Sequence, residues 1–326
     1  MSGHDVDAGR VARGLAAGII DEAGIDAAAS VTFVAVPVSQ IAHVAASVLA
    51  VNPMGLVTDV GSVKASIVTA VADARFIGGH PMAGSELEGL DGADGEMFEG
   101  ATWVLTPTGE TADADLSRLR SIIASLGAEV VALPPERHDA LVAVVSHVPH
   151  LTAATLMSLA DDQADEHAAL LRLAAGGFRD MTRIASGHPA IWPDICAANK
   201  TAVLAALDGL LRGLNDVRSV VAAGDREALL SRLEQARQAR ANLPGRVARP
   251  SDLVEFRIPV PDRAGVLAEI TTLASELGAS IADIEIAHSA EGDKGVIIVL
   301  VDAAAGDLFR GGLLARGYRP SVSRLQ

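Results

Sequence analysis

Short apolar runs alternate with helix-like stretches over the first part of the chain. The runs are rich in β-branched residues, as in strands that are buried on both faces of a parallel sheet. They cover residues 31–36, 55–59, 75–79 and 103–106, and helical spacing of apolar residues covers 9–22 and 41–49. Strands that alternate with helices predict an α/β, Rossmann-like parallel sheet domain over residues 1–135.

The pattern becomes helical from residue 136 to about 246. Leu204, Leu207, Leu211 and Leu214 recur along one face of a predicted helix. Such a stripe requires a partner helix. We therefore expect an all-α domain that forms a homodimer.

The C-terminal part, residues 251–326, follows a linker rich in proline, glycine and arginine. Val254, Phe256, Ile258 and Val260 alternate with polar residues, which predicts a half-buried strand. The remaining segments complete the order βαββαβ, a ferredoxin-like domain.

Composition excludes several classes of protein. The formal net charge of −15 argues against nucleic-acid binding, which needs basic patches. A single cysteine, Cys196, allows no disulfide within the chain. The longest apolar stretch is interrupted by His147, Pro149 and His150, and no signal peptide is visible, so we expect a cytoplasmic protein with no membrane partner.

Two stretches follow predicted strands, where α/β sheets bind ligands. Ser62 follows the second strand. Two interpretations are equally supported: it contacts a substrate, or it caps the N-terminus of a helix. His80 stands among Gly78, Gly79 and Gly84, so its backbone is constrained. Histidine suits proton transfer near neutral pH. The alternative is a turn histidine that caps backbone groups.

Further polar residues lie in the helical part. His147 and His150 share one helical face, but neither a carboxylate cluster nor H-E-x-x-H accompanies them, so we expect no metal site. Arg183 lies in a predicted irregular loop over 176–184, where arginine could bind a carboxylate. Trp192 is predicted to be a core residue rather than a site residue.

The loop at Asp262 and Gly265 leads from the first strand of the small domain into its first helix. Its glycine permits a close turn. A small ligand could bind there between two such domains.

Six motifs in this order resemble the prephenate dehydrogenase family. They are VAVPVS (34–39), VTDVGSVK (57–64), GGHPMAG (78–84), SHVPH (146–150), GGFRDMTR (176–183) and AIWPDI (190–195). The C-terminal part resembles an ACT domain, a module that often binds amino acids. The resemblance implies NAD-dependent oxidation of prephenate, with loss of carbon dioxide, to 4-hydroxyphenylpyruvate in tyrosine biosynthesis.

The resemblance also implies roles for individual residues. His80 would accept the proton of the ring hydroxyl, and Ser62 would hydrogen-bond the same hydroxyl. Arg183 would hold a substrate carboxylate, and His150 would help to bind the side chain and favour prephenate over arogenate. Ser85, Glu86 and His147 would line the site, Asp5, Pro37 and Ser62 would contact NAD, and Asp262 and Gly265 would bind an effector such as tyrosine.

The sequence departs from the dinucleotide-binding pattern at its start. A strand and G-x-G-x-x-G should lie about 20 residues before the acid that binds the ribose. Asp5 matches that acid and favours NAD over NADP, but no G-x-G-x-x-G occurs in the chain. We therefore expect an N-terminal truncation of about 25–30 residues that removes the first strand and phosphate loop, with weakened cofactor binding.

Two other classes of protein stay open. One is a non-catalytic amino-acid-sensing protein that uses the remainder as a scaffold. The other is a different nicotinamide-dependent reductase, for which Lys200 is the only lysine between residues 136 and 250 that could serve as an acid.

Overall fold

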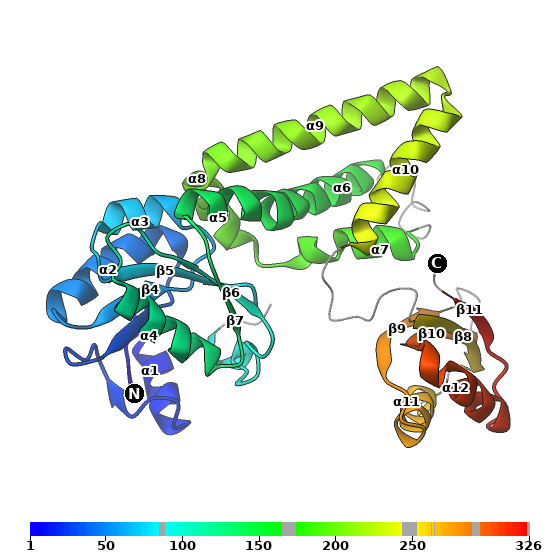
Figure 1. Ribbon diagram of the computed structural model, residues 1–326, viewed down its shortest axis with the longest axis horizontal. Helices are drawn as coiled ribbons and strands as arrows, with labels where there is room; N and C mark the ends of the chain where they lie inside the picture. Colours follow the sequence, from blue (N-terminus) through cyan, green and yellow to red (C-terminus); the bar gives the residue numbers. More distant parts are fainter. Residues whose placement is uncertain are drawn as a thin grey trace. The chain divides into compact units, whose positions relative to one another are not determined.

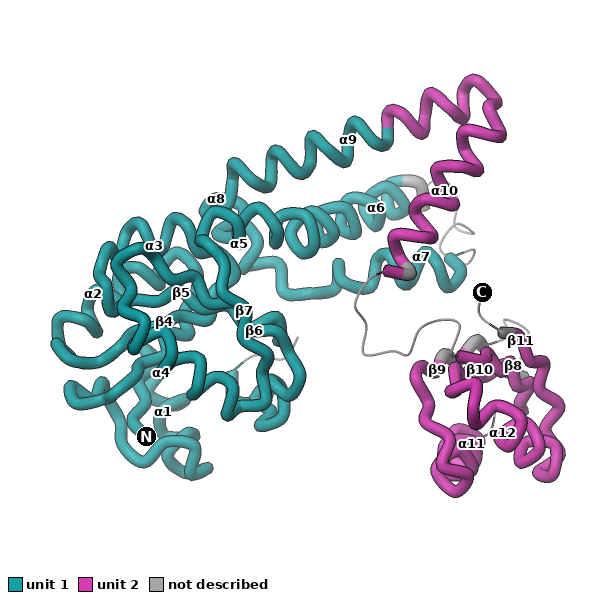
Figure 2. The backbone as a smooth tube through the Cα atoms, viewed as in Figure 1, with its two compact units in different colours: residues 1–214 teal, residues 215–326 magenta. Residues whose placement is uncertain are grey.

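The computed structural model describes residues 1–84, 89–164, 174–242, 253–261, 263, 265–288 and 294–324. It divides into two compact units, residues 1–214 and 215–326, which are shown in different colours in Figure 2. Each unit is described by itself. The predicted calls on Ser85, Glu86 and Asp262 lie outside the described residues.

A five-stranded sheet forms the centre of the first unit (Figure 1). Its order is β3 (Val31–Val34), β4 (Leu56–Asp59), β5 (Phe76–Pro81), β6 (Thr102–Thr106) and β7 (Glu129–Ala132). All neighbours are parallel except β5 and β6, which are antiparallel. The prediction of a parallel sheet is therefore wrong at this pair. The described part of the connection from β5 to β6 holds only a short 3-10 turn, η1 (Gly89–Gly92), whereas a parallel neighbour needs a crossover, usually a helix.

A separate parallel ladder joins β1 (Ser2–Gly3) to β2 (Glu22–Ala23). Helix α1 (Ala8–Ala16) connects them and is shorter than the predicted helix over 9–22. It stops because the chain turns at Gly18, whose φ of 69° suits glycine.

Among the described strands β3 pairs only with β4, and Phe33 on β3 is 38% exposed. Both β1 and β3 thus have an unpaired edge.

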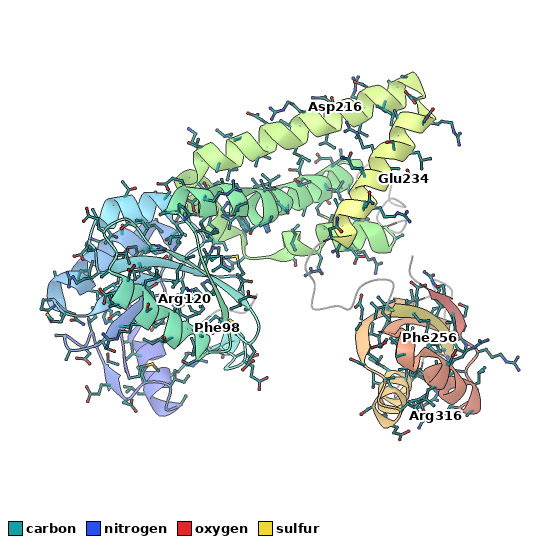
Figure 3. The ribbon with its side chains drawn as sticks, viewed as in Figure 1. Phe98, Arg120, Asp216, Glu234, Phe256 and Arg316 are labelled. Atoms are coloured by element: carbon teal, nitrogen blue, oxygen red, sulfur yellow. The ribbon has the colours of Figure 1, made fainter. Side chains whose placement is uncertain are left out.

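Helices cover both faces of the five-stranded sheet. Phe76 packs with α2 (Val38–Val51) and α3 (Ala65–Val71), whereas the next residue, Ile77, packs with α4 (Asp113–Ala124). Successive side chains of a strand point to opposite faces. Phe98, labelled in Figure 3, closes the α4 side, where its ring centroid lies 4.9 Å from that of Trp103.

The helical part of the first unit begins at the end of the sheet. It contains α5 (Pro135–Val142), a π-helical turn η2 (Ala143–His147), α6 (Val148–Ala164), α7 (Gly176–Thr182), η4 (Arg183–Ser186), η5 (Pro189–Ile191), α8 (Trp192–Ala198) and α9 (Lys200–Ala223), which continues into the second unit. The wide turn η2 precedes Pro149, which cannot donate a backbone hydrogen bond. Such turns often occur at functional sites.

The predicted irregular loop over 176–184 is instead helical. Ala175 O accepts hydrogen bonds from the N–H groups of Phe178 (3.1 Å) and Arg179 (3.2 Å), which closes the first turn of α7 despite two glycines. Arg183 then begins η4.

The stretch Pro135–Asp162 is long and apolar enough to cross a bilayer, judged by length and composition. It nevertheless carries three buried polar residues, His138, Asp139 and His147. Their partners come from the sheet and from α8–α9, as described below. Of the most apolar part of this stretch, 28% is buried inside the described structure.

The second unit contains α10 (Arg226–Ala241) and a four-stranded antiparallel sheet. The sheet order is β11 (Ser321–Arg324), β8 (Leu253–Pro261), β10 (Lys294–Asp302) and β9 (Ile281–His288), with α11 (Val266–Glu276) and α12 (Ala303–Ala315) between strands. The predicted order βαββαβ is confirmed. Alternate residues of β8 form the core with both helices, where Phe256 meets Phe309 edge to face (Figure 3).

Candidate active site

A buried ion pair joins the carboxyl ends of β4 and β5. Lys64 Nζ donates to the carboxylate of Asp59 and, at 2.7 Å, to the carbonyl oxygen of Gly79. The Gly79 N–H in turn donates to Asp59 Oδ1 at 3.0 Å. Burial lowers the pKa of Lys64, and the carboxylate of Asp59 opposes that shift. The pair therefore fixes the loop that carries Ser62 relative to the strand that carries His80.

Ser62 lies half-buried in the bend before α3. The N-cap of α3 is Lys64, so the alternative that Ser62 caps this helix is wrong. The cap is supplied from α5 instead, because the Asp139 carboxylate accepts the N–H groups of Lys64 (2.8 Å) and Ala65 (2.9 Å). This contact brings α5 against the ends of the strands.

His80 pairs with a second histidine. Its Nδ1 lies 2.8 Å from Nε2 of His138, and His138 is 1% exposed. The ring thus bonds a side chain rather than capping a turn. Burial lowers the pKa of His80 to about 2, and any positive charge on His138, Lys64 or His147 would act in the same direction. His80 is therefore neutral at physiological pH.

His147 is also buried, at 1% exposed. Its Nδ1 lies 3.3 Å from Nδ2 of Asn199, which donates to the backbone oxygen of Asp139 at 2.9 Å. Its Nε2 is buried and has no hydrogen-bond partner among the described residues. Burial is also the largest cause that lowers the pKa of His147. His147 thus offers a ring nitrogen that a bound molecule could satisfy.

His150 stacks on Trp192. The two ring centroids are 3.7 Å apart with an interplanar angle of 14°, and His147 meets the same indole edge to face at 6.1 Å. Burial lowers the pKa of His150. The prediction of Trp192 as a core residue is therefore wrong: it is half-buried and shapes the position of His150. No group of three or more potential metal ligands occurs among the described residues.

Arg183 is exposed at the start of η4. The same segment ends at Gly187, where an added Cβ would lie 3.6 Å from Cε1 of His150. The segment therefore reaches His150, although no described contact joins Arg183 to His80. Further along α6, a hollow of about 350 Å³ is lined by Ala154, Met157, Ser158, Asp161 and Ala185.

Sequence reasoning missed Asn199 and assigned no role to the adjacent pair His138 and Asp139. His138 and Asp139 gave only the signal of adjacent polar residues in an apolar stretch, and Asn199 gave none. Their importance comes from partners far along the chain: Asp139 bonds Lys64, 75 residues away, and Asn199 bonds Asp139, 60 residues away.

The predicted cofactor residues lie near strand ends. Asp5 follows β1, where its Oδ1 accepts the N–H of Asp7 at 2.8 Å and its Oδ2 lies 3.7 Å from Arg10 Nη1. Pro37 is exposed at the N-cap of α2, after β3. Gly265, the predicted effector residue, has φ 91° at the N-cap of α11.

A nicotinamide dinucleotide fits these residues only in part. The acid after β1 and the polar groups after β3 and β4 suit a ribose and a nicotinamide. The pyrophosphate needs a glycine-rich turn at a helix N-terminus, but no two glycines in the chain are separated by one residue. At the N-terminus of α1 the Asp7 carboxylate accepts the Gly9 N–H, so this helix end presents negative charge. The residues present therefore do not form a pyrophosphate site.

An α/β domain with polar residues at the carboxyl ends of its strands, followed by a helical part, suits a nucleotide-dependent enzyme. Residues 1–132 match the family described as prephenate dehydrogenase, nucleotide-binding domain. Residues 134–235 match the family described as prephenate dehydrogenase, dimerization domain. The chain belongs to the prephenate dehydrogenase family.

Three relatives illustrate the match. Prephenate dehydrogenase of Bacillus subtilis is 34% identical over 315 residues, which cover 90% of this chain and 83% of that protein. The structure of Aquifex aeolicus prephenate dehydrogenase with hydroxyphenyl propionate and NAD⁺ has a TM-score of 0.70 at 29% identity and covers 74% of this chain and 88% of the other. Arogenate dehydrogenase of Synechocystis has a TM-score of 0.64 at 29% identity, with 73% and 89% covered.

Proposed function

We propose that this chain is a prephenate dehydrogenase, which converts prephenate with NAD⁺ to 4-hydroxyphenylpyruvate and carbon dioxide. The observation that carries the proposal is His80, an unprotonated imidazole held at the carboxyl end of β5. Oxidation of a ring hydroxyl requires a base for the hydroxyl proton. Aromatisation supplies the driving force, so the site mainly needs this base and anchors for the substrate.

The remaining site residues supply those anchors. Ser62 hydrogen-bonds the ring hydroxyl, since it lies on the loop that Lys64 ties to the end of β5. Arg183 binds a substrate carboxylate, for which a guanidinium has the matching geometry. His150 binds the side chain of the substrate from its stacked position on Trp192. Ser85, Glu86 and His147 complete the lining.

NAD⁺ supplies the hydride acceptor when it is bound, and Asp5, Pro37 and Ser62 contact it. We propose that the phosphate-binding part is added by a parallel strand with a glycine-rich turn that joins the sheet at β1 and β3. The unpaired edges of these two strands and the exposed Phe33 support this.

The domains are proposed as residues 1–135, 136–246 and 251–326. We propose that the last is a ferredoxin-like ACT domain that binds an amino acid such as tyrosine at Asp262 and Gly265; its βαββαβ order supports this. The leucine stripe of α9 supports a homodimer. We also propose that the enzyme is cytoplasmic.

Arogenate is the second candidate substrate, because an arogenate dehydrogenase is as similar to this chain in sequence as the Aquifex enzyme. The two substrates differ in the side chain, which carries a keto group in prephenate and an amino group in arogenate. Residue 150 is a histidine rather than an acidic residue that would attract the arogenate ammonium, which favours the keto acid.

The test is NAD⁺ reduction with prephenate or arogenate, with 4-hydroxyphenylpyruvate identified as product. Two proteins are compared: this chain and a version extended at its N-terminus by the next upstream in-frame sequence. We expect turnover of prephenate by the extended protein, tighter NAD⁺ binding than in the shorter one, and loss of turnover in His80→Asn. Absence of turnover in both folded proteins would overturn the proposal in favour of a non-catalytic sensing protein.

A further inference from the structure

The His138 side chain bridges His80 and Asp139. Nδ1 of His80 lies 2.8 Å from Nε2 of His138, and Nδ1 of His138 lies 2.8 Å from Oδ1 of Asp139. We propose that His138 and Asp139 are positioning residues that set the tautomer of His80 and stabilise its charge after it accepts the substrate proton. This role rests on the proposed function, in which His80 is the base.

The position of the first hydrogen follows from Asp139. Its Oδ1 accepts the N–H of Lys64 at 2.8 Å, and its Oδ2 accepts the N–H of Ala65 at 2.9 Å. A backbone N–H can only donate, so both oxygens act as acceptors. The hydrogen between Asp139 and His138 therefore belongs to Nδ1 of the imidazole. Neutral His138 then has its lone pair on Nε2.

The lone pair on Nε2 of His138 determines the tautomer of His80. The 2.8 Å contact between the rings requires a hydrogen, which Nδ1 of His80 must donate because Nε2 of His138 carries none. Nε2 of His80 is then the nitrogen that is free to accept a proton. A carboxylate sets the tautomer of the base in the same way in Ser-His-Asp hydrolases. Here one imidazole, His138, stands between the carboxylate and the base.

The arrangement also stabilises the charge that forms in the reaction. The O–H bond of the ring hydroxyl breaks, its proton moves to Nε2 of His80, and the electron pair of that bond forms the carbonyl; bound NAD⁺ would accept the hydride from the ring carbon. His80 becomes positive near Lys64 and His147, both of which disfavour that charge when positive. Asp139, two hydrogen bonds away, supplies the opposite charge. Without it the protonated intermediate would be less stable.

Asp139 also caps α3, so its replacement alone would not separate a role in the reaction from a structural one. Replacement of His138 distinguishes a role in the reaction from a structural one, because the contacts by which Asp139 caps α3 do not involve His138. In His138→Gln the amide oxygen can still accept the N–H of His80, whereas in His138→Leu nothing at this position can. The two side chains are of similar size and differ in whether they can form hydrogen bonds at this position.

Steady-state kinetics of the N-terminally extended protein give the first test. We expect kcat of His138→Leu to fall by roughly 100-fold or more with little change in KM, because a positioned base contributes about 10²–10⁴-fold. His138→Gln should recover at least tenfold of that loss. Equal kcat values in the two variants would overturn the proposal. Asp113→Asn, an exposed change on α4, is the control for nonspecific effects.

Nitrogen-15 NMR of the histidine rings gives a test that needs no turnover. In the wild-type chain Nε2 of His80 should be unprotonated, with its signals identified by their loss in His80→Asn. In Asp139→Asn the amide group can donate to His138, which should reverse both tautomers and protonate Nε2 of His80. A protonated Nε2 in the wild type would overturn the proposal. If the protein does not oxidise prephenate, the proposed function fails, while this measurement still decides the tautomer.

Discussion

Lys64 and Asp59 form an ion pair in which neither side chain is exposed to solvent. The pair connects the loop after β4 to the end of β5 through Gly79. Burial of two charges is costly, so such a pair seldom adds stability compared with apolar residues. Its role here is to hold the loop after β4, which carries Ser62, in a fixed position relative to the end of β5, which carries His80.

Replacing one member of this pair should strongly destabilise the protein. Lys64→Met leaves the Asp59 carboxylate buried without its partner, which should cost about 3–5 kcal/mol of the free energy of unfolding. Urea unfolding followed by circular dichroism measures this. Lys200→Met, at an exposed lysine on α9, should change the stability by less than about 0.5 kcal/mol. Equal stability of the two variants would contradict the role assigned to the pair.

The half-buried His80 should make stability depend on pH. The folded-state pKa of His80 is about 2, whereas the ordinary value is 6.5. Between these values the unfolded chain binds a proton that the folded chain does not, so stability is present above pH 6.5 and declines as the pH falls below it. The slope is at most about 1.4 kcal/mol per pH unit for one proton.

His80→Asn should remove this contribution. Urea unfolding at several values between pH 5 and pH 8 should show a shallower acid decline in the variant than in the wild type. His147 and His150 also have lowered pKa values, so part of the decline should persist. Parallel curves for the two proteins would show that His80 is not buried in neutral form.

Gly79 has no room for a side chain. An added Cβ would lie 2.5 Å from the backbone oxygen of Asp59 and 2.8 Å from Oγ1 of Thr58. Because backbone atoms of β4 cannot move aside, Gly79→Ala should destabilise the protein by about 1–3 kcal/mol and reduce kcat through displacement of His80. Thermal unfolding and steady-state kinetics test both effects. Gly109→Ala, where nothing lies within 4 Å of the new Cβ, is the matched control.

The local patterns of the sequence predicted the elements well, because apolar periodicity depends on residues close in the chain. The runs over 31–36 and 55–59 became β3 and β4, and the order βαββαβ was confirmed. The antiparallel β6 was not predicted, since strand direction depends on the connection rather than on the strand. The predicted end of α1 and the predicted loop over 176–184 were wrong for a similar reason. A glycine can end a helix in one context and be accommodated within a helix in another.

The candidate site was predicted only where residues lie in recognisable short motifs. Ser62, His80 and His150 stand in such motifs. His138, Asp139 and Asn199 form their contacts across 58 to 75 residues of chain, and no local pattern encodes such distances. Trp192 was assigned to the core from its residue type alone, while its position on His150 depends on how α8 packs beside α6.

The stack of His150 on Trp192 should affect substrate binding more than the chemical step. Aromatic pairs contribute about 0.5–1.5 kcal/mol beyond burial. Trp192→Ala should therefore raise KM for prephenate by roughly 2- to 10-fold through loss of the fixed imidazole, with a smaller change in kcat. Trp192→Phe keeps a ring for stacking and should recover most of the loss. A variant with reduced kcat and unchanged KM would assign the indole to another role.

The leucine stripe on α9 should form a subunit interface. Leu204, Leu211 and Leu214 are about half exposed, with Leu211 at 56%, although they recur along one helical face. Exposed leucines in such a row favour burial against a second copy of the same face, since a two-fold interface uses one patch twice. Leu211→Glu should place like charges opposite each other and shift the protein from dimer to monomer in light scattering. Leu126→Glu, at an exposed leucine beyond α4, should leave the dimer intact, and a wild-type protein that is monomeric at micromolar concentration would show that the stripe serves another purpose.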